Sequence, residues 1–408
     1  MNKITPIILM LFFQIGQGFS FNLVGTMNFG WILALVYTLC FIFSSSLFRN
    51  EEFRTISKFY LFLIILQIIA EYMAGNSLQN GIKGISIDVV SYMSFFFLVS
   101  LLIKDPKLII WALVGTIIRM LLFGKESDSS AEEALRGEDA TFLKFYLGPL
   151  IIYCLLIISV FFRTKAFSYI YVFVGLIFVV LGARSLGLIT LLTGLFVLFV
   201  RFKKTNVTAV LKEYSLILLL AFYGLYAIYV YNVMNGNISA GNNVQLLDSQ
   251  NPYNPLEIIK YSRTDAWIAM EEFMEKPLWG FGSWADDPGL KYHAMMAKMT
   301  TSILNVDAFD NGVVLPAHSV ILGKAAYNGF FVALITAMII FFFIKRGFKL
   351  LNSDNSYMFI IIYYLYSLIW HSLFSPVGHL RDSFPMFFAF IYVVWLYEKN
   401  NYNDIIYE

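Results

Sequence analysis

Apolar runs of similar length, separated by short polar segments, recur along almost the whole chain. Each run is close to the ~20 residues that an α-helix needs to cross the hydrocarbon core of a bilayer. The pattern predicts twelve spans, near residues 5–23, 28–48, 57–74, 85–103, 108–123, 143–162, 166–183, 185–200, 213–231, 317–344, 357–374 and 383–397. We therefore expect an all-α, polytopic integral membrane protein.

One long segment interrupts this alternation and divides the chain into three parts. Residues 1–231 carry the first nine predicted spans, residues 232–316 form a long loop, and residues 317–408 carry the last three spans and the C-terminal tail. A connection as long as this loop is usually functional or disordered. Helix signals inside the loop favour the functional interpretation.

The clearest of these signals is the stretch "LEIIKYSRTDAWIAMEEFMEK". It follows an Asn-Pro pair that is typical of a helix cap and a first-turn proline. One helical face carries Arg263 together with an apolar stripe, which consists of Ile259, Trp267, Met270 and Met274. The proline and glycines of "PLWGFG" then end the predicted helix, and the Met-rich "GLKYHAMMAKMTTSIL" is a second helical candidate.

Basic residues are distributed unevenly between alternate connections. If the N-terminus is cytoplasmic, most of them fall in the cytoplasmic loops: Arg49, Arg54, Lys58, Lys104, Lys107, Arg163, Lys165, Arg201, Lys203, Lys204, Lys212, Lys345, Arg346, Lys349 and Lys399. The outer loops carry fewer basic residues and the acidic stretch "GKESDSSAEEALRGEDA". Because positive residues mark the cytoplasmic side, we expect both termini inside and the long loop outside.

Composition supports the membrane interpretation and excludes two other classes. The chain is 59% hydrophobic and 14% charged, whereas soluble domains carry about 25% charged residues. A net charge of +2 without a basic block gives no sign of nucleic-acid binding. Cys40 and Cys154 lie inside apolar runs, which favours buried thiols over a disulfide or a metal site. The N-terminus has no convincing cleavage site, so we expect an uncleaved first span.

Few ionisable residues fall within the predicted spans, and each lies toward the outer end of its helix. They are Glu71, Asp88, Arg119 and Lys324. Ionisable residues in spans usually mark function, but ion-coupled transporters place theirs near the midplane on broken helices. The polar chemistry is therefore predicted at the outer face, beneath the long loop.

Two arginines at this face suit an anionic ligand. Arg184 lies in the turn between two spans, where a snorkelling arginine is the simpler interpretation. Arg263 lies on the apolar face of the loop helix and needs an anionic partner, either a carboxylate such as Asp265 or a bound phosphate. A guanidinium binds phosphate through two hydrogen bonds.

Histidines complete the outward-facing set. His318 lies where the loop enters the tenth span; it is either structural or a general base, because its ordinary pKa is near 6.5. Lys324 follows it, as a snorkelling or a phosphate-steering residue. The other members of the set are His293, His371, His379 and Arg381. The outer face has no supply of ATP or nucleotide sugars, so a synthetic reaction there needs a preactivated donor, such as a sugar chain on a polyprenyl diphosphate.

Three stretches carry a resemblance to a known family. "GARSLGLITLL" has an arginine between two spans, "SRTDAWIAMEEFMEKPLWGFGSW" has an Arg, a Trp and a Pro-x-x-Gly-x-Gly motif, and "AHSVILGKAAYNGFF" has a histidine, a small polar residue and a later glycine. They resemble the bacterial O-antigen polymerase and O-antigen ligase superfamily, mainly over residues 180–345. The family often has Asn after the histidine, where this chain has Ser319.

The resemblance implies a GT-C-like glycosyltransferase of the bacterial inner membrane with its active site facing the periplasm. Donor and acceptor would be oligosaccharides on undecaprenyl diphosphate, Arg184 and Arg263 would hold the diphosphate, and His318 would be the base of an inverting displacement. Arg381, His379, His293, Lys324, Trp267 and Trp284 are the candidate substrate-binding residues, and Trp279 or Trp284 could stack on sugars. No cofactor is expected and, without an Asp-x-Asp signature, no metal; a chain-length regulator would be a further partner.

Several alternatives stay open. A ligase would transfer the polysaccharide to lipid A core instead of extending another repeat unit, and a peptidoglycan-type polymerase is a third enzyme. The alternative from another class is a lipid-linked sugar flippase or another transporter, which twelve spans with both ends inside would suit. The absence of charge near the midplane and the outer Arg/His set argue against transport.

Overall fold

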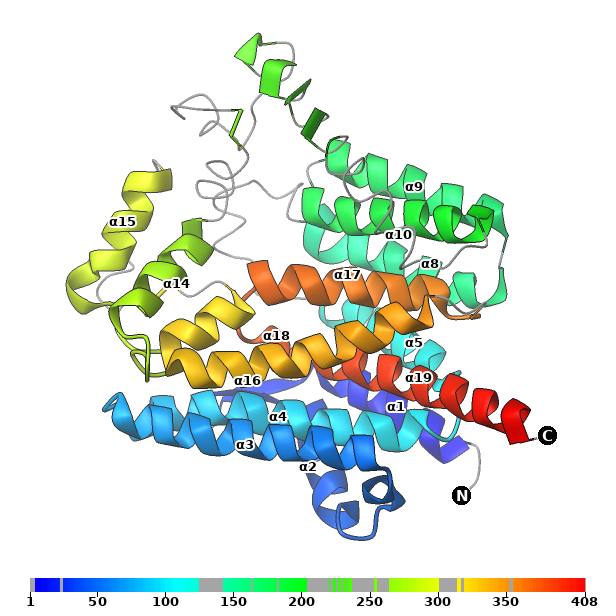
Figure 1. The fold of residues 1–408 in the computed structure, drawn as a ribbon, viewed down its shortest axis with the longest axis horizontal. Coiled ribbons are helices and arrows are strands. Elements are labelled where there is room, and N and C mark those ends of the chain that lie inside the picture. Colours follow the sequence, from blue (N-terminus) through cyan, green and yellow to red (C-terminus); the bar gives the residue numbers. More distant parts are fainter. Residues whose placement is uncertain are drawn as a thin grey trace.

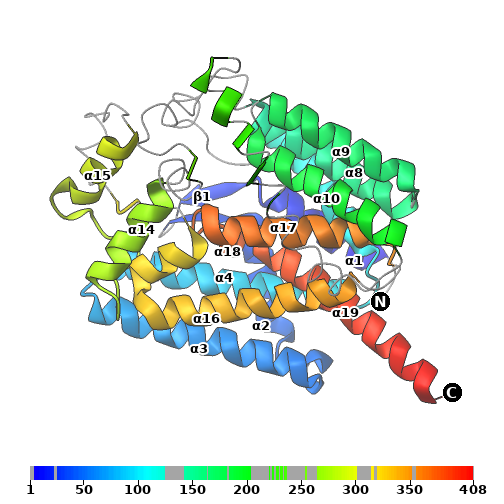
Figure 2. The ribbon, with the colours of Figure 1, turned by 45° about the horizontal axis from the view of Figure 1, so that its top comes forward.

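The structure is a computed structural model, which describes residues 4–22, 25–124, 142–162, 164–181, 183–203, 253–254, 264–300, 314–316, 319–351 and 355–407, with isolated positions between 220 and 236. The described part is mostly helical, which confirms the expected all-α class. Its sheet is a two-stranded antiparallel hairpin in which Phe21 lies opposite Met27. Figures 1 and 2 show a bundle of long helices with a smaller helical lobe at one end.

The chain up to residue 161 supplies the first elements of this bundle. Its elements are α1 (Ile4–Gly16), β1 (Ser20–Asn22), β2 (Thr26–Asn28), α2 (Phe29–Phe41), η1 (Ser46–Arg49), α3 (Glu51–Met73), α4 (Leu78–Leu102), α5 (Leu108–Phe123), η2 (Leu143–Leu147) and α8 (Gly148–Phe161). The two long helices α3 and α4 each begin at a side-chain cap. Asn50 accepts hydrogen bonds from the first turn of α3, and Ser77 does the same for α4.

The remaining elements complete the bundle and the lobe. They are α9 (Lys165–Val180), α10 (Arg184–Lys203), α14 (Thr264–Glu275), η4 (Pro288–Leu290), α15 (Lys291–Thr300), α16 (Val320–Leu350), α17 (Met358–Phe374), α18 (His379–Asp382) and α19 (Phe384–Tyr407). The helices α14 and α15 pack against each other and form the lobe, and α14 packs against α16 (Figure 1).

Within the described residues, four helices are long and apolar enough to cross a membrane: α3, α4, the continuous η2–α8 unit at Leu143–Phe161, and α16. The predicted spans other than 213–231 each coincide with a helix, whereas 213–231 lies largely outside the described residues. Helices α1 and α2 have 13 residues each, which at 1.5 Å per residue is about 20 Å, short of the ~30 Å hydrocarbon core. The first predicted span ends early because the chain turns into the β1–β2 hairpin. The twelve-span count stays a prediction.

The core of the bundle is built around α4. Phe95, Phe96 and Phe97 are fully buried, so this helix is covered on all sides, which explains why its sequence is apolar all round. Phe95 contacts Phe343 of α16, which stacks on Phe388 of α19 with ring centroids 4.2 Å apart. Helices α3, α4, α16 and α19 therefore form one packed unit.

A second packed unit consists of α8, α9 and α10 against α17. Small residues let the backbones of α9 and α10 approach closely: a Cβ on Gly194 would lie 2.8 Å from the carbonyl oxygen of Ser168, and one on Gly187 would lie 2.7 Å from the carbonyl oxygen of Gly175. Glycine at such crossings is typical of helices that associate in membranes.

Candidate functional site at the loop end of the bundle

The bundle has two ends with different polar contacts. At the end opposite the lobe, Arg346 of α16 lies 2.9 Å from Glu52 of α3, and Tyr392 of α19 donates to Asn50. At the other end, which we call the loop end, α3 finishes, α4 begins, and the lobe packs against α16 (Figure 1). Among the described residues, the buried charged side chains of the candidate spans are Glu71 at the loop end, and Asp88 and Lys324 between the loop end and the middle of the bundle.

Helix α16 is broken at Gly329. The backbone there has φ 79° and ψ −177°, a conformation that essentially only glycine adopts. From the break onward, α16 runs antiparallel to α3: Asn328, next to the break, contacts Glu71 near the end of α3, and Arg346 contacts Glu52 near its start. Before the break, Lys324 reaches Gln67, which lies one turn further into α3 than Glu71. The first section of α16 therefore folds back along the bundle, as both views show (Figures 1 and 2).

Loop residues 277–284 fill the break. The backbone N–H of Phe281 donates to the carbonyl of Ala326 at 3.0 Å, and that of Gly282 donates to the carbonyl of Tyr327 at 2.7 Å. On the other side of the break, Phe330 N–H donates to the carbonyl of Pro277 at 2.8 Å. Backbone groups freed inside a membrane protein must find partners, and this segment supplies them.

The Pro-x-x-Gly-x-Gly motif therefore has a structural explanation. Gly280 and Gly282 have φ of 69° and 93°, where residues with a side chain would be strained. A Cβ on Gly280 would lie 2.4 Å from the carbonyl oxygen of Tyr327, and a Cβ on Gly329 would lie 2.0 Å from that of Leu278. The motif in the loop and the glycine in α16, far apart in the sequence, interlock by backbone contact.

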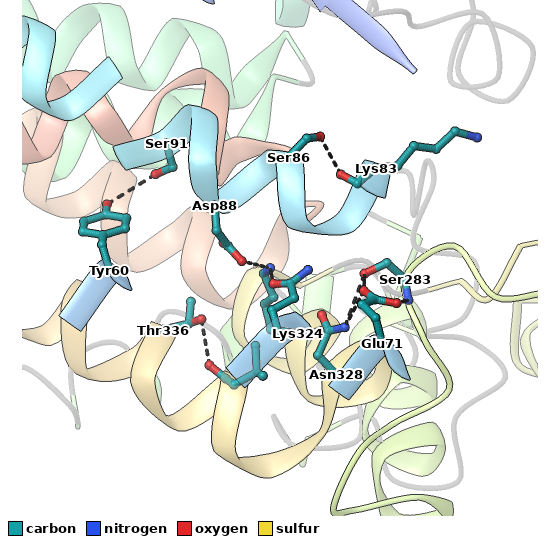
Figure 3. Close-up of polar contacts among 12 residues, drawn as sticks. Tyr60, Glu71, Lys83, Ser86, Asp88, Ser91, Ser283, Lys324, Asn328 and Thr336 are labelled. Carbon is teal, nitrogen blue, oxygen red and sulfur yellow. Dashed lines mark hydrogen bonds and ion pairs between the residues drawn. The ribbon is translucent and has the colours of Figure 1, made fainter. Parts of the chain in front are cut away.

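The carboxylate of Glu71 fastens this interlock. It accepts hydrogen bonds from Asn76 Nδ2 at 2.6 Å, from the backbone N–H of Ser283 at 3.1 Å, from Asn328 Nδ2 at 2.8 Å and from the Ser283 hydroxyl. Figure 3 shows Ser283 and Asn328 pointing at Glu71 from the loop and from α16. We call these four residues the Glu71 latch. With four donors on its two oxygens, this carboxylate is engaged in holding the loop to the bundle.

Lys324 lies beside the latch and is buried in an ion pair. Its ammonium group is 2.8 Å from Asp88 Oδ2 and 2.5 Å from Gln67 Oε1, and the Lys324 and Asp88 side chains are each 1% exposed. Asp88 lies near the middle of α4, because this helix begins earlier than the predicted span. Lys324 therefore has Asp88 and Gln67 as internal partners. A role for Lys324 in steering phosphate stays a prediction.

Within the lobe, His293 and Asp287 form a dyad. Asp287 Oδ2 is 2.8 Å from His293 Nδ1 and 2.9 Å from the His293 backbone nitrogen, while Oδ1 accepts from the backbone of Tyr292. The Asp287 side chain is fully buried, whereas that of His293 is partly exposed. A carboxylate that accepts from Nδ1–H leaves the lone pair of Nε2 available as a base. The dyad thus has the geometry of a general base, a role that the sequence analysis did not assign to His293.

Glu272 is a second titratable group of the lobe. Its side chain is buried on the inner face of α14, and neither carboxylate oxygen has a hydrogen-bond partner among the described residues. Burial, together with the nearby Asp287, raises the pKa of this carboxyl to about 8. Glu272 is therefore mostly a neutral acid at pH 7.

Two histidines stack where α17 meets α18. The rings of His371 and His379 are 4.2 Å apart and nearly parallel, and their Nδ1 atoms lie 2.7 Å from Ser375 Oγ and 3.1 Å from Ser383 Oγ. The hydroxyl of Ser319, the cap of α16, donates to the carbonyl of Ser372. The start of α16 therefore lies against this corner of the bundle.

Arg381 belongs to the same corner. Its guanidinium lies over the ring of Trp31, 4.5 Å from the centroid, and the closest approach to a carboxylate is 3.9 Å, to Asp382. Its Nε atom is buried without a hydrogen-bond partner in the described part of the chain. Burial lowers the pKa of this guanidinium, only partly offset by Asp382. A poorly solvated guanidinium with so little pairing suits an anion.

Arg184 is exposed and begins α10 at the loop end. The end of α8 lies beside the start of α17, because Ser159 and Phe359 both interact with Tyr171 of α9. The start of α8 lies beside the start of α10, where Leu186 approaches Gly148. The helix α10 therefore begins at the end of the bundle at which α17 finishes. The structure thus brings Arg184 to the same end as His379 and Arg381.

The other predicted residues are placed as follows. His318 and Arg263 lie outside the described residues, immediately before the cap of α16 and the first residue of α14. Trp284, with φ 51°, stacks on Tyr327 at 6.1 Å, and Trp267 lies on the outer face of α14, 41% exposed. Among the described residues, no group of three or more His, Cys, Asp or Glu could hold a metal ion.

Sequence reasoning missed the residues that organise this end. The sequence identifies Glu71 and Asp88 only as ionisable residues in spans, and it gives Asp287 no role. Nothing in the sequence pairs Glu71 with Ser283 or Asp88 with Lys324, because each pair is separated by more than 200 positions. The sequence did contain one signal. A charged residue within a span is costly, so each such residue needs a partner elsewhere in the chain.

Comparisons with known proteins add no family. No protein-family model matches the chain, and a search of curated proteins finds no match. The resemblance to the O-antigen polymerase and ligase superfamily therefore stays a prediction from the three sequence stretches.

Proposed function

We propose that this protein is a membrane-embedded glycosyltransferase that joins oligosaccharide repeat units carried on undecaprenyl diphosphate. The observation that carries the proposal is the interlock of the loop with α16, which holds the lobe at the loop end. The residues next to His318 and Arg263 in the chain begin helices there, at the same end as Arg184, His379 and Arg381. Arg184 and the segment with His379 and Arg381 lie at this end of the apolar bundle, and we expect Arg263 and His318 to join them there.

In this reaction the nucleophile is a hydroxyl of the acceptor sugar. A histidine, His318 in the first instance, takes the hydroxyl proton while the oxygen attacks the anomeric carbon of the donor. The bond between that carbon and the diphosphate oxygen breaks, and undecaprenyl diphosphate leaves with the electron pair. Arg184 and Arg263 stabilise the charge that grows on the leaving group, an interaction that is strongest in the transition state. Direct displacement inverts the anomeric configuration.

The cellular setting follows from the same proposal. The protein would lie in the bacterial inner membrane with both termini in the cytoplasm and the loop end in the periplasm, where lipid-linked repeat units are available. A chain-length regulator is a partner that such a polymerase would accommodate. Neither a metal nor a cofactor enters the proposed step, since diphosphate is already a good leaving group.

The deciding experiment uses the purified protein in detergent with undecaprenyl-diphosphate oligosaccharide as the sole substrate. We expect a ladder of products that differ by one repeat unit, and a loss of at least ~100-fold in rate for His318→Ala, in line with the usual contribution of a general base. Products that appear only after addition of lipid A core would identify a ligase instead. An inactive wild-type protein under both conditions would contradict the glycosyltransferase.

Transport is the second candidate, because α16 is broken and carries a buried charge beside the break. Broken helices and paired charges within spans are typical of transporters, and Lys324, Asp88 and Glu71 fit that pattern. Proteoliposomes that contain the protein and a labelled lipid-linked oligosaccharide separate the two functions. Translocation at an unchanged rate by His318→Ala, without any polymer, would favour the transporter.

A further inference from the structure

The outer face of α14 carries an exposed apolar stripe. Trp267, Met270 and Met274 lie three and four residues apart on one side of this helix, with exposed fractions of 41%, 41% and 64%, and Leu278 continues the stripe just after the helix ends. The opposite face, with Ile268 and Ala269, is fully buried against the bundle. The sequence predicted this stripe but not the direction in which it faces, which is outward.

An outward apolar stripe needs a partner other than water. Contiguous exposed apolar surface is uncommon on soluble proteins and marks contact with a protein or a membrane. The acidic residues Glu271 and Glu275 border the stripe on one side, and Glu275 pairs with Lys291 of α15. The helix therefore has three zones around its circumference: a buried face, an apolar outer strip and a charged edge.

The stripe continues onto a helix that is a candidate membrane span. Leu278 is 57% exposed and approaches Gly329, and beyond the break Phe330, Phe331 and Leu334 of α16 are 42–45% exposed. Trp279, the residue after Leu278, contacts the ring of Phe331 with centroids 6.1 Å apart, so the segment that follows α14 packs against the exposed side of α16 just beyond the break. The exposed side of α16 faces lipid if α16 crosses the bilayer, and the strip on α14 is an extension of that same surface.

We propose that α14 is an interfacial helix, whose stripe of Trp267, Met270, Met274 and Leu278 lies in the boundary between lipid headgroups and acyl chains. Helices of this kind bury an apolar face by about 5–10 Å while their charged edge stays in water, and tryptophan is enriched at this depth. The occupant is the phospholipid surface itself. The inference does not use the proposed reaction, because it rests on exposure and on continuity with α16.

With α14 at the membrane surface, the backbone contact between residues 277–284 and α16 fixes the position of the lobe relative to the bilayer. Residues 277–284 join α14 to the break in α16, so a helix held at the membrane surface also holds the His293–Asp287 dyad at that level. The diphosphate of any lipid-linked molecule lies at the same level, since its prenyl chain occupies the hydrocarbon core.

Single cysteines that carry an environment-sensitive fluorophore test the proposal. In a background with Cys40 and Cys154 replaced by alanine, the full chain is reconstituted into vesicles of phosphatidylcholine and phosphatidylglycerol. Met270→Cys and Met274→Cys report the stripe, Glu271→Cys is the matched control on the charged edge of the same helix, and Leu334→Cys reports the exposed side of α16. Each sample is quenched by iodide in water and, separately, by a nitroxide on the upper acyl chain.

We expect the nitroxide to quench the labels at 270, 274 and 334 several-fold more than the label at 271, and iodide to show the reverse order. Labels at 270 and 274 that iodide quenches as strongly as the label at 271 would overturn the proposal. Protection of these labels from both quenchers would overturn it as well, because it would mean that a protein surface covers the stripe. The label at 334 reports whether α16 faces lipid. It therefore separates that question from whether α14 lies at the membrane surface.

Discussion

The charged residues of the bundle and those of the lobe are used in different ways. In the bundle, Glu71 accepts four hydrogen bonds, and Asp88 and Lys324 neutralise each other at 1% exposure. In the lobe, His293 is held by one ring nitrogen and is partly exposed, and Glu272 is buried with a raised pKa. A charge inside a membrane protein is costly unless it is paired, so the bundle uses its charges to hold structure. Groups with capacity to exchange protons lie in the lobe and at the α17–α18 corner.

Substitution at the buried ion pair of the bundle should have the largest effect on the stability of the protein. Lys324→Met leaves the Asp88 carboxylate without its counter-charge, and removal of one partner from a buried pair costs about 3–5 kcal/mol. We expect a large fall in the thermal unfolding midpoint in detergent. The double variant Lys324→Met/Asp88→Asn should recover most of this loss, because no net charge stays buried. Equal instability of the single and the double variant would contradict a structural role for the pair.

The connection between the two regions depends on Gly329. Gly329→Ala places a side chain at φ 79° and brings its Cβ to about 2.0 Å from the carbonyl oxygen of Leu278. Backbone strain of this kind costs about 1–3 kcal/mol, and relief of the clash moves residues 277–284 away from α16. We expect faster proteolysis within the loop and a lower unfolding midpoint. Gly378→Ala is the matched control at the same end, since its Cβ would meet its nearest atom at 3.6 Å; similar effects of the two substitutions would contradict the interlock.

The lobe should respond to pH through Glu272, with a smaller effect. Its pKa rises from an ordinary value near 4.5 to about 8 in the folded protein, so the folded state holds a proton that the unfolded state releases. Stability is therefore highest below the ordinary pKa and falls progressively as the pH rises toward 8. Thermal unfolding of the wild type and of Glu272→Gln between about pH 5 and pH 8 measures this fall. The variant should lose most of the pH dependence, and an unchanged slope would mean that another group is responsible.

The sequence by itself determined the class of the molecule and the positions of its helices. Apolar runs of membrane-crossing length predicted every described long helix of the bundle, because burial in lipid or in a helical core selects for apolar side chains whatever the tertiary contacts are. It also indicated that Glu71, Asp88 and Lys324 matter, since charges in apolar helices are costly. The helix around Trp267, Met270 and Met274 was predicted for the same reason, from its periodicity.

Only the tertiary structure decided what these residues do. Glu71 meets Ser283 and Lys324 meets Asp88 across more than 200 positions of sequence, and a span's own pattern carries no information about its partner. Helix periodicity likewise predicts that a stripe exists but not whether it faces the core or lipid, because both environments favour the same side chains. The break at Gly329 was hidden inside an apolar run, since the groups that satisfy its backbone come from the loop. Local pattern reflects the solvent that each residue prefers, whereas the choice among possible partners is made by the packing of the whole chain.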